Sequence, residues 1–273
     1  TLIFSTKLGV LYPLIYEFIY NQKISVGAPF YNAIFVPITL IACIFLYFSI
    51  DSKWQQSLNI KSLFQPLPIS LTFSATIVIL AFFQFSITNL WTLASLLIGS
   101  IIIIRYMIVI YFYFVYRKFT NIFSVIAHCG LGLLIISIAL NDNLSSERAI
   151  NIKINETEIY KDHQITLKNL RMVPGPNFDS VKADFLIENP NGKTFTLTPE
   201  KRKYFARGQV TTETAIHASF LKDIYLTIGD QLDDGSWIVN IQFNIFIRWI
   251  WFSAIMMVVA GLLLAHSLSR SRP

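Results

Sequence analysis

Long apolar runs constrain the fold of this chain more than any other feature. A helix needs about 20 mostly apolar residues to cross the hydrocarbon core of a bilayer. Five segments meet or approach that length: Phe30–Ile50, Leu67–Ile87, Leu90–Ile110, Ile122–Leu140 and Ile245–Ala265. The opening stretch Leu2–Ile19 is apolar but contains Lys7 and Pro13, which is typical of the end of a span cut short by the first residue. We therefore expect a polytopic α-helical membrane protein with about five full spans plus a truncated first span.

The composition agrees with a membrane location for these runs. Hydrophobic residues make up 54% of the 273 residues and charged residues only 14%, whereas a soluble domain has about 25% charged residues. An ordinary soluble globular protein and a disordered chain are therefore excluded. The two cysteines lie within apolar runs, and so small a number excludes a disulfide-stapled scaffold.

The charged residues divide the chain into two parts. Residues 141–243 contain 12 Lys and Arg and 14 Asp and Glu, whereas the other 170 residues contain 10 and 2. The basic excess thus belongs to the apolar part, which indicates a membrane topology and argues against nucleic acid as a partner. Seven basic residues lie on the loops, span ends and tail: Lys53, Lys61, Arg105, Arg117, Lys118, Arg270 and Arg272. An alternating path places all seven, with the C-terminus, on the inside, and leaves residues 141–243 outside, in the periplasm or its mitochondrial equivalent.

Residues 141–244 have the sequence rhythm of a β domain. Runs that alternate apolar and polar residues are Ile150–Ile154, Gln164–Met172, Val181–Glu188, Thr194–Thr198, Asp223–Ile228 and Trp237–Phe243. Turn-forming clusters rich in Pro, Gly, Asn and Asp separate several of them. About 100 residues of this kind predict a small sandwich or barrel inserted between two spans. We therefore expect a transmembrane helical region at 1–140, an outer-face all-β domain at 141–244, and a last transmembrane helix with a basic inner tail at 245–273.

His128 is the candidate functional residue of the helical part. It lies inside the apolar run Ile122–Leu140, where an ionisable side chain is costly and points to function. A neutral imidazole can offer one nitrogen to a metal while the other donates a proton to a carbonyl. Gly130 and Gly132 leave room for a flat group or another helix to approach closely. A ligand or proton-path role and a packing histidine bonded to a neighbouring helix both remain open at this point.

The other histidines give weaker signals. His163 and His217 lie in the predicted β domain without a partner motif, so a solvated surface position is expected for both. His266 lies at the inner end of the last span, where an interfacial role is expected. Arg105 lies inside a span, and its expected explanation is a snorkelling side chain, with a salt bridge to a cofactor's carboxylate as the alternative. The sequence contains none of the common catalytic motifs, so it assigns no catalytic residue.

Four strings of this sequence resemble the C-terminal portion of the CcmF family of cytochrome c maturation proteins. Leu11-Tyr12-Pro13 followed by residues 24–32 is similar to that family's LYP…VSVGPPYFN segment, and residues 127–130 resemble its AHxG span. Residues 198–204 with 211–213 resemble its PEKRxY…TE segment, and residues 249–261 its closing WIWxG span. The four strings follow the family's order and cover essentially the whole chain. The family's upstream WWD segment is not found here, so we expect either a fragment or the C-terminal subunit of a split mitochondrial CcmF.

The resemblance implies a function. CcmF-like proteins work with CcmH and CcmI as the cytochrome c heme lyase, which takes heme from the holo-CcmE chaperone and joins it to the CXXCH thiols of apocytochrome c. The family also holds a structural b-type heme between two span histidines. His128 occupies the position of the second of those iron ligands, and its partner ligand belongs to the upstream half of CcmF. The implied location is the bacterial or mitochondrial inner membrane, and catalysis is expected to need the upstream portion and the partner subunits.

The resemblance also suggests roles for other residues. Gly130 would admit the porphyrin plane beside His128. An outer heme-loading surface is expected at the mouth of the first full span, at Gly27, Pro29, Tyr31 and Asn32, although a capped helix entry would also explain the Pro and Asn. Glu200, Arg202 and Tyr204 are candidates for docking CcmH or apocytochrome, with a plain hydrated hairpin as the alternative.

Two other functions compete with the heme lyase component. One is a transporter subunit that moves heme or another small molecule, which broken helices and inverted repeats would favour; the sequence shows neither. The other is a membrane-anchored assembly scaffold without a cofactor, for which His128 would be replaceable.

Overall fold

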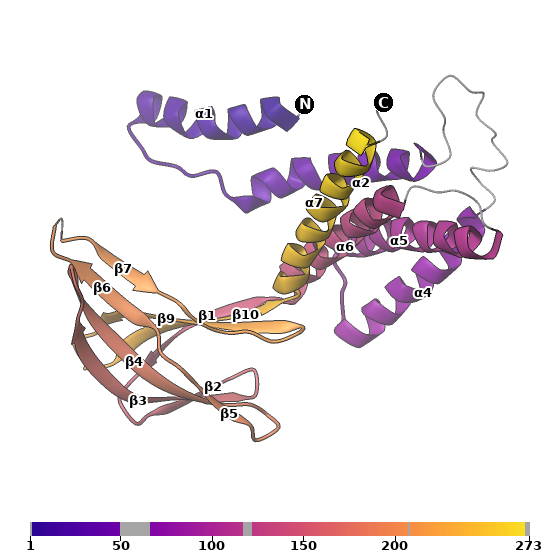
Figure 1. Cartoon of the computed structure of the whole chain (residues 1–273). Coiled ribbons are helices and arrows are strands. Elements are labelled where there is room, and N and C mark those ends of the chain that lie inside the picture. Colours follow the sequence, from indigo (N-terminus) through magenta and orange to yellow (C-terminus); the bar gives the residue numbers. More distant parts are fainter. Residues whose placement is uncertain (1, 50–65, 117–121, 207, 271–273) are drawn as a thin grey trace. The chain divides into compact units, whose positions relative to one another are not determined.

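The computed structural model describes residues 2–49, 66–116, 122–206 and 208–270, and it divides into two units (Figure 1). One unit comprises Thr1–Ala139 with Ile250–Pro273 and is helical, and the other comprises Leu140–Trp249 and is built of strands. Five of the predicted basic flanking residues lie outside the described residues: Lys53, Lys61, Arg117, Lys118 and Arg272.

Six helices are described: α1 (Leu2–Tyr20), α2 (Ala28–Ser49), α4 (Leu67–Phe85), α5 (Leu90–Tyr116), α6 (Ile122–Leu144) and α7 (Ile247–Arg270). Five of them, α2 and α4 to α7, are long and apolar enough to cross a membrane, which confirms the five predicted spans. The opening stretch is helical as α1 but is not one of these five, so its reading as a truncated span stays a prediction. The protein is thus a multi-pass membrane protein with an inserted β domain.

Glycine lets α5 and α6 pack with their backbones nearly in contact. A Cβ placed on Gly132 would lie 2.7 Å from the carbonyl oxygen of Gly99, and one placed on Gly99 would lie 2.9 Å from that of Gly132. Beyond this contact Ile102 and Tyr106 of α5 are buried together with Val125 of α6. Because no side chain separates the helices at the glycines, the residues around them are held close.

Ten strands are described in the β unit. They are β1 (Ser146–Ile152), β2 (Thr157–Tyr160), β3 (His163–Pro174), β4 (Phe178–Glu188), β5 (Thr194–Leu197), β6 (Glu200–Tyr204), β7 (Val210–Glu213), β8 (Ala215–His217), β9 (Lys222–Gln231) and β10 (Trp237–Ile245). The antiparallel order β1-β10-β9-β8 forms one sheet. The second sheet has the order β2-β3-β4-β6-β7, with β5 paired to β4. The predicted strand runs correspond to β1, β3, β4, β5, β9 and β10. β6 was expected only as part of a hydrated hairpin, the alternative to a docking role, and it pairs with β7. β2, β7 and β8 had no predicted strand run.

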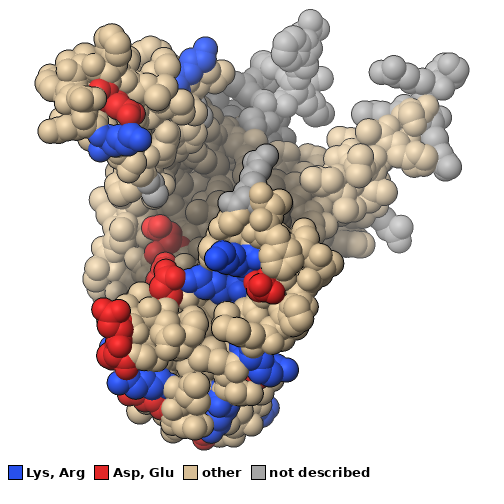
Figure 2. Space-filling view, turned by 90° about the vertical axis from the view of Figure 1, so that its left-hand side faces the viewer, with Lys and Arg blue, Asp and Glu red and all other residues tan. Residues whose placement is uncertain are grey.

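Alternation along the strands builds the core between the two sheets. Ile165, Leu167 and Phe185 from one sheet and Leu226 and Ile241 from the other are at most 1% exposed. Most of their neighbours along each strand are polar or charged and are more exposed, as expected for a sheet with one solvated side. Figure 2 shows the consequence on one face, where Lys, Arg, Asp and Glu gather over the β unit while the helices are mostly uncharged.

The chain enters and leaves the β unit on neighbouring strands. Helix α6 leads into β1 and β10 leads into α7, and β1 pairs with β10 from Ser146↔Phe243 to Ile152↔Trp237. Side chains close this junction: Asn141 Nδ2 donates to the Ile245 carbonyl at 2.7 Å.

The first turn of α7 is tied to the β8–β9 loop. Arg248 Nε donates to both carboxylate oxygens of Asp223, at 3.0 and 3.2 Å, and this carboxylate is almost completely buried. The indole of Trp249 donates to the Phe220 carbonyl at 3.0 Å, and the two rings meet edge to face. The first turn of α7 is therefore packed against the start of β9 and the loop before it.

Candidate functional site

His128 is held in one orientation by its own helix and by α5. Its Nδ1–H donates to the carbonyl oxygen of Ser124, one turn earlier, at 2.6 Å. The imidazole stacks on the ring of Tyr106, with centroids 4.8 Å apart and planes inclined by 15°. This bond places the proton on Nδ1 and leaves the Nε2 lone pair free to bind a metal. Among the residues the structure describes, none donates a hydrogen bond to Nε2.

The environment of His128 combines close packing with partial exposure. Tyr106 is 4% exposed, whereas His128 itself is half-buried, so one side of the ring is open in this chain. His128 is the seventh residue of α6, roughly 9 Å along the helix from Ile122 at 1.5 Å per residue. A histidine that is held in the helix by its Nδ1–H, with the Nε2 lone pair left over, is suited to bind a heme iron through Nε2.

Arg105 precedes Tyr106 on α5 and is buried, at 6% exposed. The helix continues for eleven residues beyond it, to Tyr116, whereas the predicted span ended at Ile110. The head group thus lies inside the helical unit rather than reaching out from a helix end, and the expected snorkelling explanation is wrong for this unit. The alternative, a cation for a cofactor's carboxylate, stays a prediction.

Gly130 lies at the contact between α6 and α7. A Cβ on Gly130 would lie 2.8 Å from Met257 Cγ and 3.2 Å from both Met256 Cε and the Ser253 carbonyl oxygen. The structure therefore gives Gly130 a helix-packing role, and its predicted role at a porphyrin plane stays untested.

The predicted outer heme-loading residues lie at the start of α2. Gly27 precedes the helix, Pro29 occupies its first turn, and Asn32 is exposed. Tyr31 points back to α1, because a Cβ on Gly9 would lie 2.7 Å from its hydroxyl oxygen. The four residues are thus close together along the chain, and their ligand role stays a prediction.

The predicted docking residues form a ladder on one face of β6. Tyr204, Arg202 and Glu200 pair across to Phe178, Ser180 and Lys182 of β4. Lys182 Nζ contacts a Glu200 carboxylate oxygen at 2.7 Å, and Arg202 Nε donates to its other oxygen at 3.0 Å. Hydrogen bonding from Lys182 first, and from Arg202 and Ser180, lowers the pKa of the Glu200 carboxyl.

The ladder continues through the aromatic residues. The Arg202 guanidinium lies 4.8 Å from the centre of the Phe178 ring, which also meets Tyr204 edge to face. Glu200, Arg202 and Tyr204 could be grouped from the sequence, but their partners on β4 could not be identified, because spacing along one strand does not reveal the strand opposite. The side chains bind one another, which gives the motif a structural role in this sheet.

The histidines of the β unit depart from expectation. His163 is 3% exposed, so its predicted surface position is wrong. Its Nδ1–H donates to the Lys161 carbonyl at 2.7 Å, and its Nε2 accepts from Lys222 Nζ at 3.1 Å. His217 is half-buried and stacks on Phe195 with ring centroids 3.7 Å apart. His266 is exposed near the end of α7.

Comparisons with known proteins relate the chain to one family. A family model described as the CcmF C-terminal beta-sandwich matches residues 143–244. The chain is 27% identical to the cytochrome c-type biogenesis proteins CcmF of Pseudomonas fluorescens and of Escherichia coli. It is 28% identical to the cytochrome c-type biogenesis protein ccl1 of Rhodobacter capsulatus. These alignments include 93–94% of this chain and 40% of each relative, so the chain spans about two fifths of their length.

A solved structure has the same fold. The cytochrome c heme lyase CcmF superposes with a TM-score of 0.76 over 96% of this chain and 43% of that chain, at 13% identity. The predicted architecture of apolar spans with an inserted β domain is thereby confirmed, and the β domain is of the sandwich type. We conclude that this chain is similar to the CcmF cytochrome c-type biogenesis proteins over about two fifths of their length, and that its β domain is similar to the CcmF C-terminal beta-sandwich.

Proposed function

We propose that this chain is a component of the cytochrome c heme lyase of the multi-component maturation system. It holds a b-type heme in the membrane through His128 and helps to attach heme to the CXXCH thiols of apocytochrome c. Support comes from the relatives, which are named as cytochrome c-type biogenesis proteins, and from the fold shared with a heme lyase.

The orientation of His128 is the single observation that carries the cofactor proposal. The Ser124 carbonyl binds Nδ1–H, Tyr106 supports one face of the ring, and Nε2 remains available. These residues fit a heme iron, since a fixed neutral imidazole in an apolar span is a suitable axial ligand. When bound, the heme supplies one-electron chemistry, and the proposed task is to keep the incoming heme reduced. A second ligand to the iron would come from the upstream half of CcmF.

His128, held in place by α6, would orient the heme. Helix α5 would exclude water from one side of the imidazole. Arg105 is buried and precedes Tyr106 in the sequence, and its guanidinium would bind a carboxylate of the cofactor. The thioether bond itself would need the reduced heme and the free thiols brought together, so positioning would provide much of the rate. We therefore assign no catalytic residue to this chain.

The three parts of the chain would then have separate tasks. Residues 1–140 and the last helix at 245–273 would form the membrane region in a bacterial or mitochondrial inner membrane. Residues 141–244 would lie on the periplasmic or intermembrane-space side, with the C-terminus inside. Gly27, Pro29, Tyr31 and Asn32 would shape the outer heme-loading surface.

The β domain would provide the docking surface of the complex. CcmH- and CcmI-like subunits, holo-CcmE, apocytochrome c and the upstream half of CcmF are the proposed partners. Within that domain, Glu200, Arg202 and Tyr204 are the proposed contacts, the more exposed atoms of their ladder being free to bind a second chain.

Absorption spectroscopy tests the cofactor proposal. Reduced-minus-oxidised spectra are recorded for the assembled complex with wild-type chain, with His128→Ala and with the control His266→Ala. We expect a bis-histidine b-type signal in the wild type and in the control, and loss of both this signal and cytochrome c maturation in His128→Ala. An unchanged spectrum in His128→Ala would refute the ligand assignment. A wild-type assembly without any heme signal would favour a membrane-anchored scaffold or a transporter subunit.

A further inference from the structure

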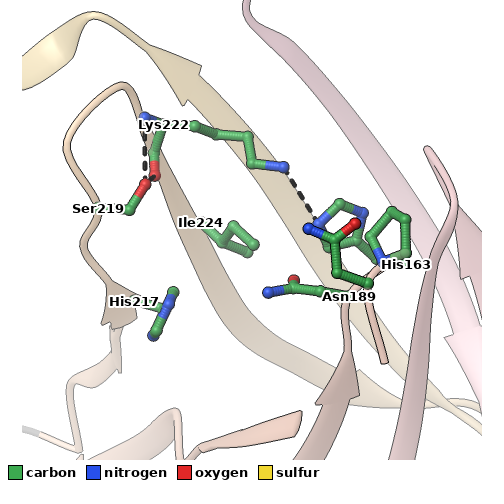
Figure 3. A pocket seen from close by; sticks show the side chains of 8 residues that line it. His163, Asn189, His217, Ser219, Lys222 and Ile224 are labelled. Atoms are coloured by element: carbon green, nitrogen blue, oxygen red, sulfur yellow. Dashed lines mark hydrogen bonds between the residues drawn. The ribbon is translucent and has the colours of Figure 1, made fainter. Parts of the chain in front are cut away.

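A cavity of about 250 Å³, lined by both polar and apolar side chains, opens between the two sheets at one end of the β sandwich (Figure 3). Residues from both sheets line it: His163 from β3, Asn189 from the loop after β4, His217 from β8, Ser219 from the β8–β9 loop, and Lys222 and Ile224 from β9. The Lys222 side chain extends across the cavity toward His163, and Ile224 lies between the two histidines.

Lys222 is directed by its contacts with the cavity wall. Its Nζ donates to His163 Nε2 at 3.1 Å and lies 5.0 Å from the centre of the Phe243 ring. His163 can accept only because its own proton is on Nδ1, bound to the Lys161 carbonyl. Burial, and then the neighbouring charge of Lys222, lowers the pKa of His163, which keeps the ring neutral and accepting. The acceptor therefore holds the ammonium in place without neutralising it.

The ammonium of Lys222 has no carboxylate counter-ion among the described residues. Ion pairs within 4.0 Å are present for Lys153, Lys182 and Lys201 of the same unit, but not for Lys222. Partial burial, and then the nearby charge of Lys161, lowers the pKa of Lys222. The neighbouring Asp223 is already bound to Arg248, and Asp162 lies exposed in the turn before His163.

Lys222 is partly buried, and removing part of the water around an ion is costly unless a partner compensates for it. An anion in the cavity would complete the pairing of Lys222. The amide of Asn189 and the imidazole of His217 offer further hydrogen-bond donors on the opposite walls. The cavity has room for several waters, each of which takes about 30 Å³ in the liquid, and thus for a small oxyanion but not for a porphyrin.

We propose that this cavity is a binding site for a small free oxyanion, a phosphate or a short dicarboxylate, held by the Lys222 ammonium. The site lies within the β domain and is separate in chemistry from the His128 site. It requires no metal, and among the described residues no cluster of three His, Cys, Asp or Glu side chains could hold one. The proposal does not depend on the heme lyase function.

Calorimetric titration of the full chain tests the site. Inorganic phosphate and succinate are titrated separately, in an uncharged detergent at pH 7 and low ionic strength, so the two arms distinguish the oxyanions. Lys222→Met keeps the apolar stem and removes the charge. The control Lys168→Met removes the same charge from an exposed position on β3 away from the cavity. We expect at least tenfold weaker binding in Lys222→Met and unchanged binding in the control.

A measurement on the unmodified chain covers the case in which Lys222→Met does not fold. Lysine acetylation by an activated ester is followed residue by residue by mass spectrometry, with and without about 10 mM of the ion. This concentration is roughly the upper end of the dissociation constants of weak sites. We expect the ion to protect Lys222 but not Lys168. The proposal would be overturned by any of three results: equal affinity of the two variants, no binding of either ion up to that concentration, or equal acetylation of Lys222 with and without the ion.

Discussion

The contact between Gly99 and Gly132 predicts that an added methyl group will destabilise the helical unit. In Gly132→Ala the new Cβ would lie 2.7 Å from the Gly99 carbonyl oxygen and 2.7 Å from Ile103 Cγ1. Ordinary contact begins near 3.4 Å, so α5 and α6 would have to separate by roughly 0.7 Å, the difference between the two distances. The carbonyl belongs to a helix backbone and cannot rotate away.

The magnitude follows from two opposing effects. Overpacking of this kind costs about 1–3 kcal/mol, and a gap of this size forfeits a quarter to a half of the dispersion energy across it. Alanine is favoured over glycine inside a helix by about 1 kcal/mol. Gly261→Ala on α7 gains the second effect without the first, because nothing lies within 4 Å of the added Cβ. We therefore expect Gly261→Ala to be about 1–3 kcal/mol more stable than Gly132→Ala.

Thermal unfolding of the full chain in detergent measures this difference. The apparent melting temperature of Gly132→Ala should lie about 2–10 °C below that of Gly261→Ala, and the wild type should not melt above Gly261→Ala. Because Gly132 lies one turn from His128, Gly132→Ala should also shift the visible spectrum of the assembled complex if His128 binds heme. A Gly132→Ala chain that melts at or above the temperature of Gly261→Ala would refute the close-packing argument.

Three predictions concern the β unit, all measured by urea unfolding of the full chain in detergent with circular dichroism of the strands. Glu200→Gln should make the free energy of unfolding less sensitive to acid. The hydrogen bond from Lys182 lowers the pKa of Glu200 below its ordinary 4.5. The stabilisation by the ionised carboxylate is therefore present above pH 4.5 and is lost as the pH falls through the pKa of the folded protein. The idea fails if both chains lose stability equally between about pH 5 and 3. Arg248→Leu should lower the free energy of unfolding by about 2–3 kcal/mol, because it leaves the buried Asp223 carboxylate without its cation. The loss is smaller than for a fully buried pair because the arginine is half-exposed. A loss under about 1 kcal/mol would contradict this. Phe185→Ala should cost about 3–5 kcal/mol through the cavity it leaves at a fully buried position, and an unfolding curve like that of the wild type would disprove its place in the core.

The spans were predictable because each consists of a long run with one character. Leu90–Tyr116 is apolar or aromatic almost throughout, so its helix could be located, although its end was placed six residues early. The aromatic residues after Ile110 continue the helix, and hydropathy alone does not distinguish a helix that ends at the membrane surface from one that extends past it.

The strands show where local pattern stops being informative. β4 alternates buried and partly buried residues from Ala183 to Glu188 and was predicted, whereas β6 reads Glu-Lys-Arg-Lys-Tyr and has no apolar face. Its place in the sheet comes from ion pairs and aromatic contacts with β4, which lie about 20 residues away in the sequence. Such strands are specified by their partners, so the sequence of one strand does not reveal them.

The candidate site residues were likewise predictable only where the signal is local in the sequence. His128 stood out because an ionisable residue is rare in an apolar run, and one turn of helix is enough to supply the Ser124 carbonyl. Its stacking partner Tyr106 lies on another helix and gave no signal among the many aromatic residues. The burial of His163 was missed for the same reason, since its partner Lys222 is 59 residues away.

The pairing of β1 with β10 sets the order of events while the protein is being made. β1 is an edge strand whose only partner in its sheet is β10, and β10 is synthesised about 90 residues later, immediately before α7. At roughly 5–20 residues per second, β1 waits several seconds for its partner. The four-stranded sheet can therefore close only when the start of α7 has emerged. Completion of the β unit and insertion of the last helix thus become one late step of biogenesis.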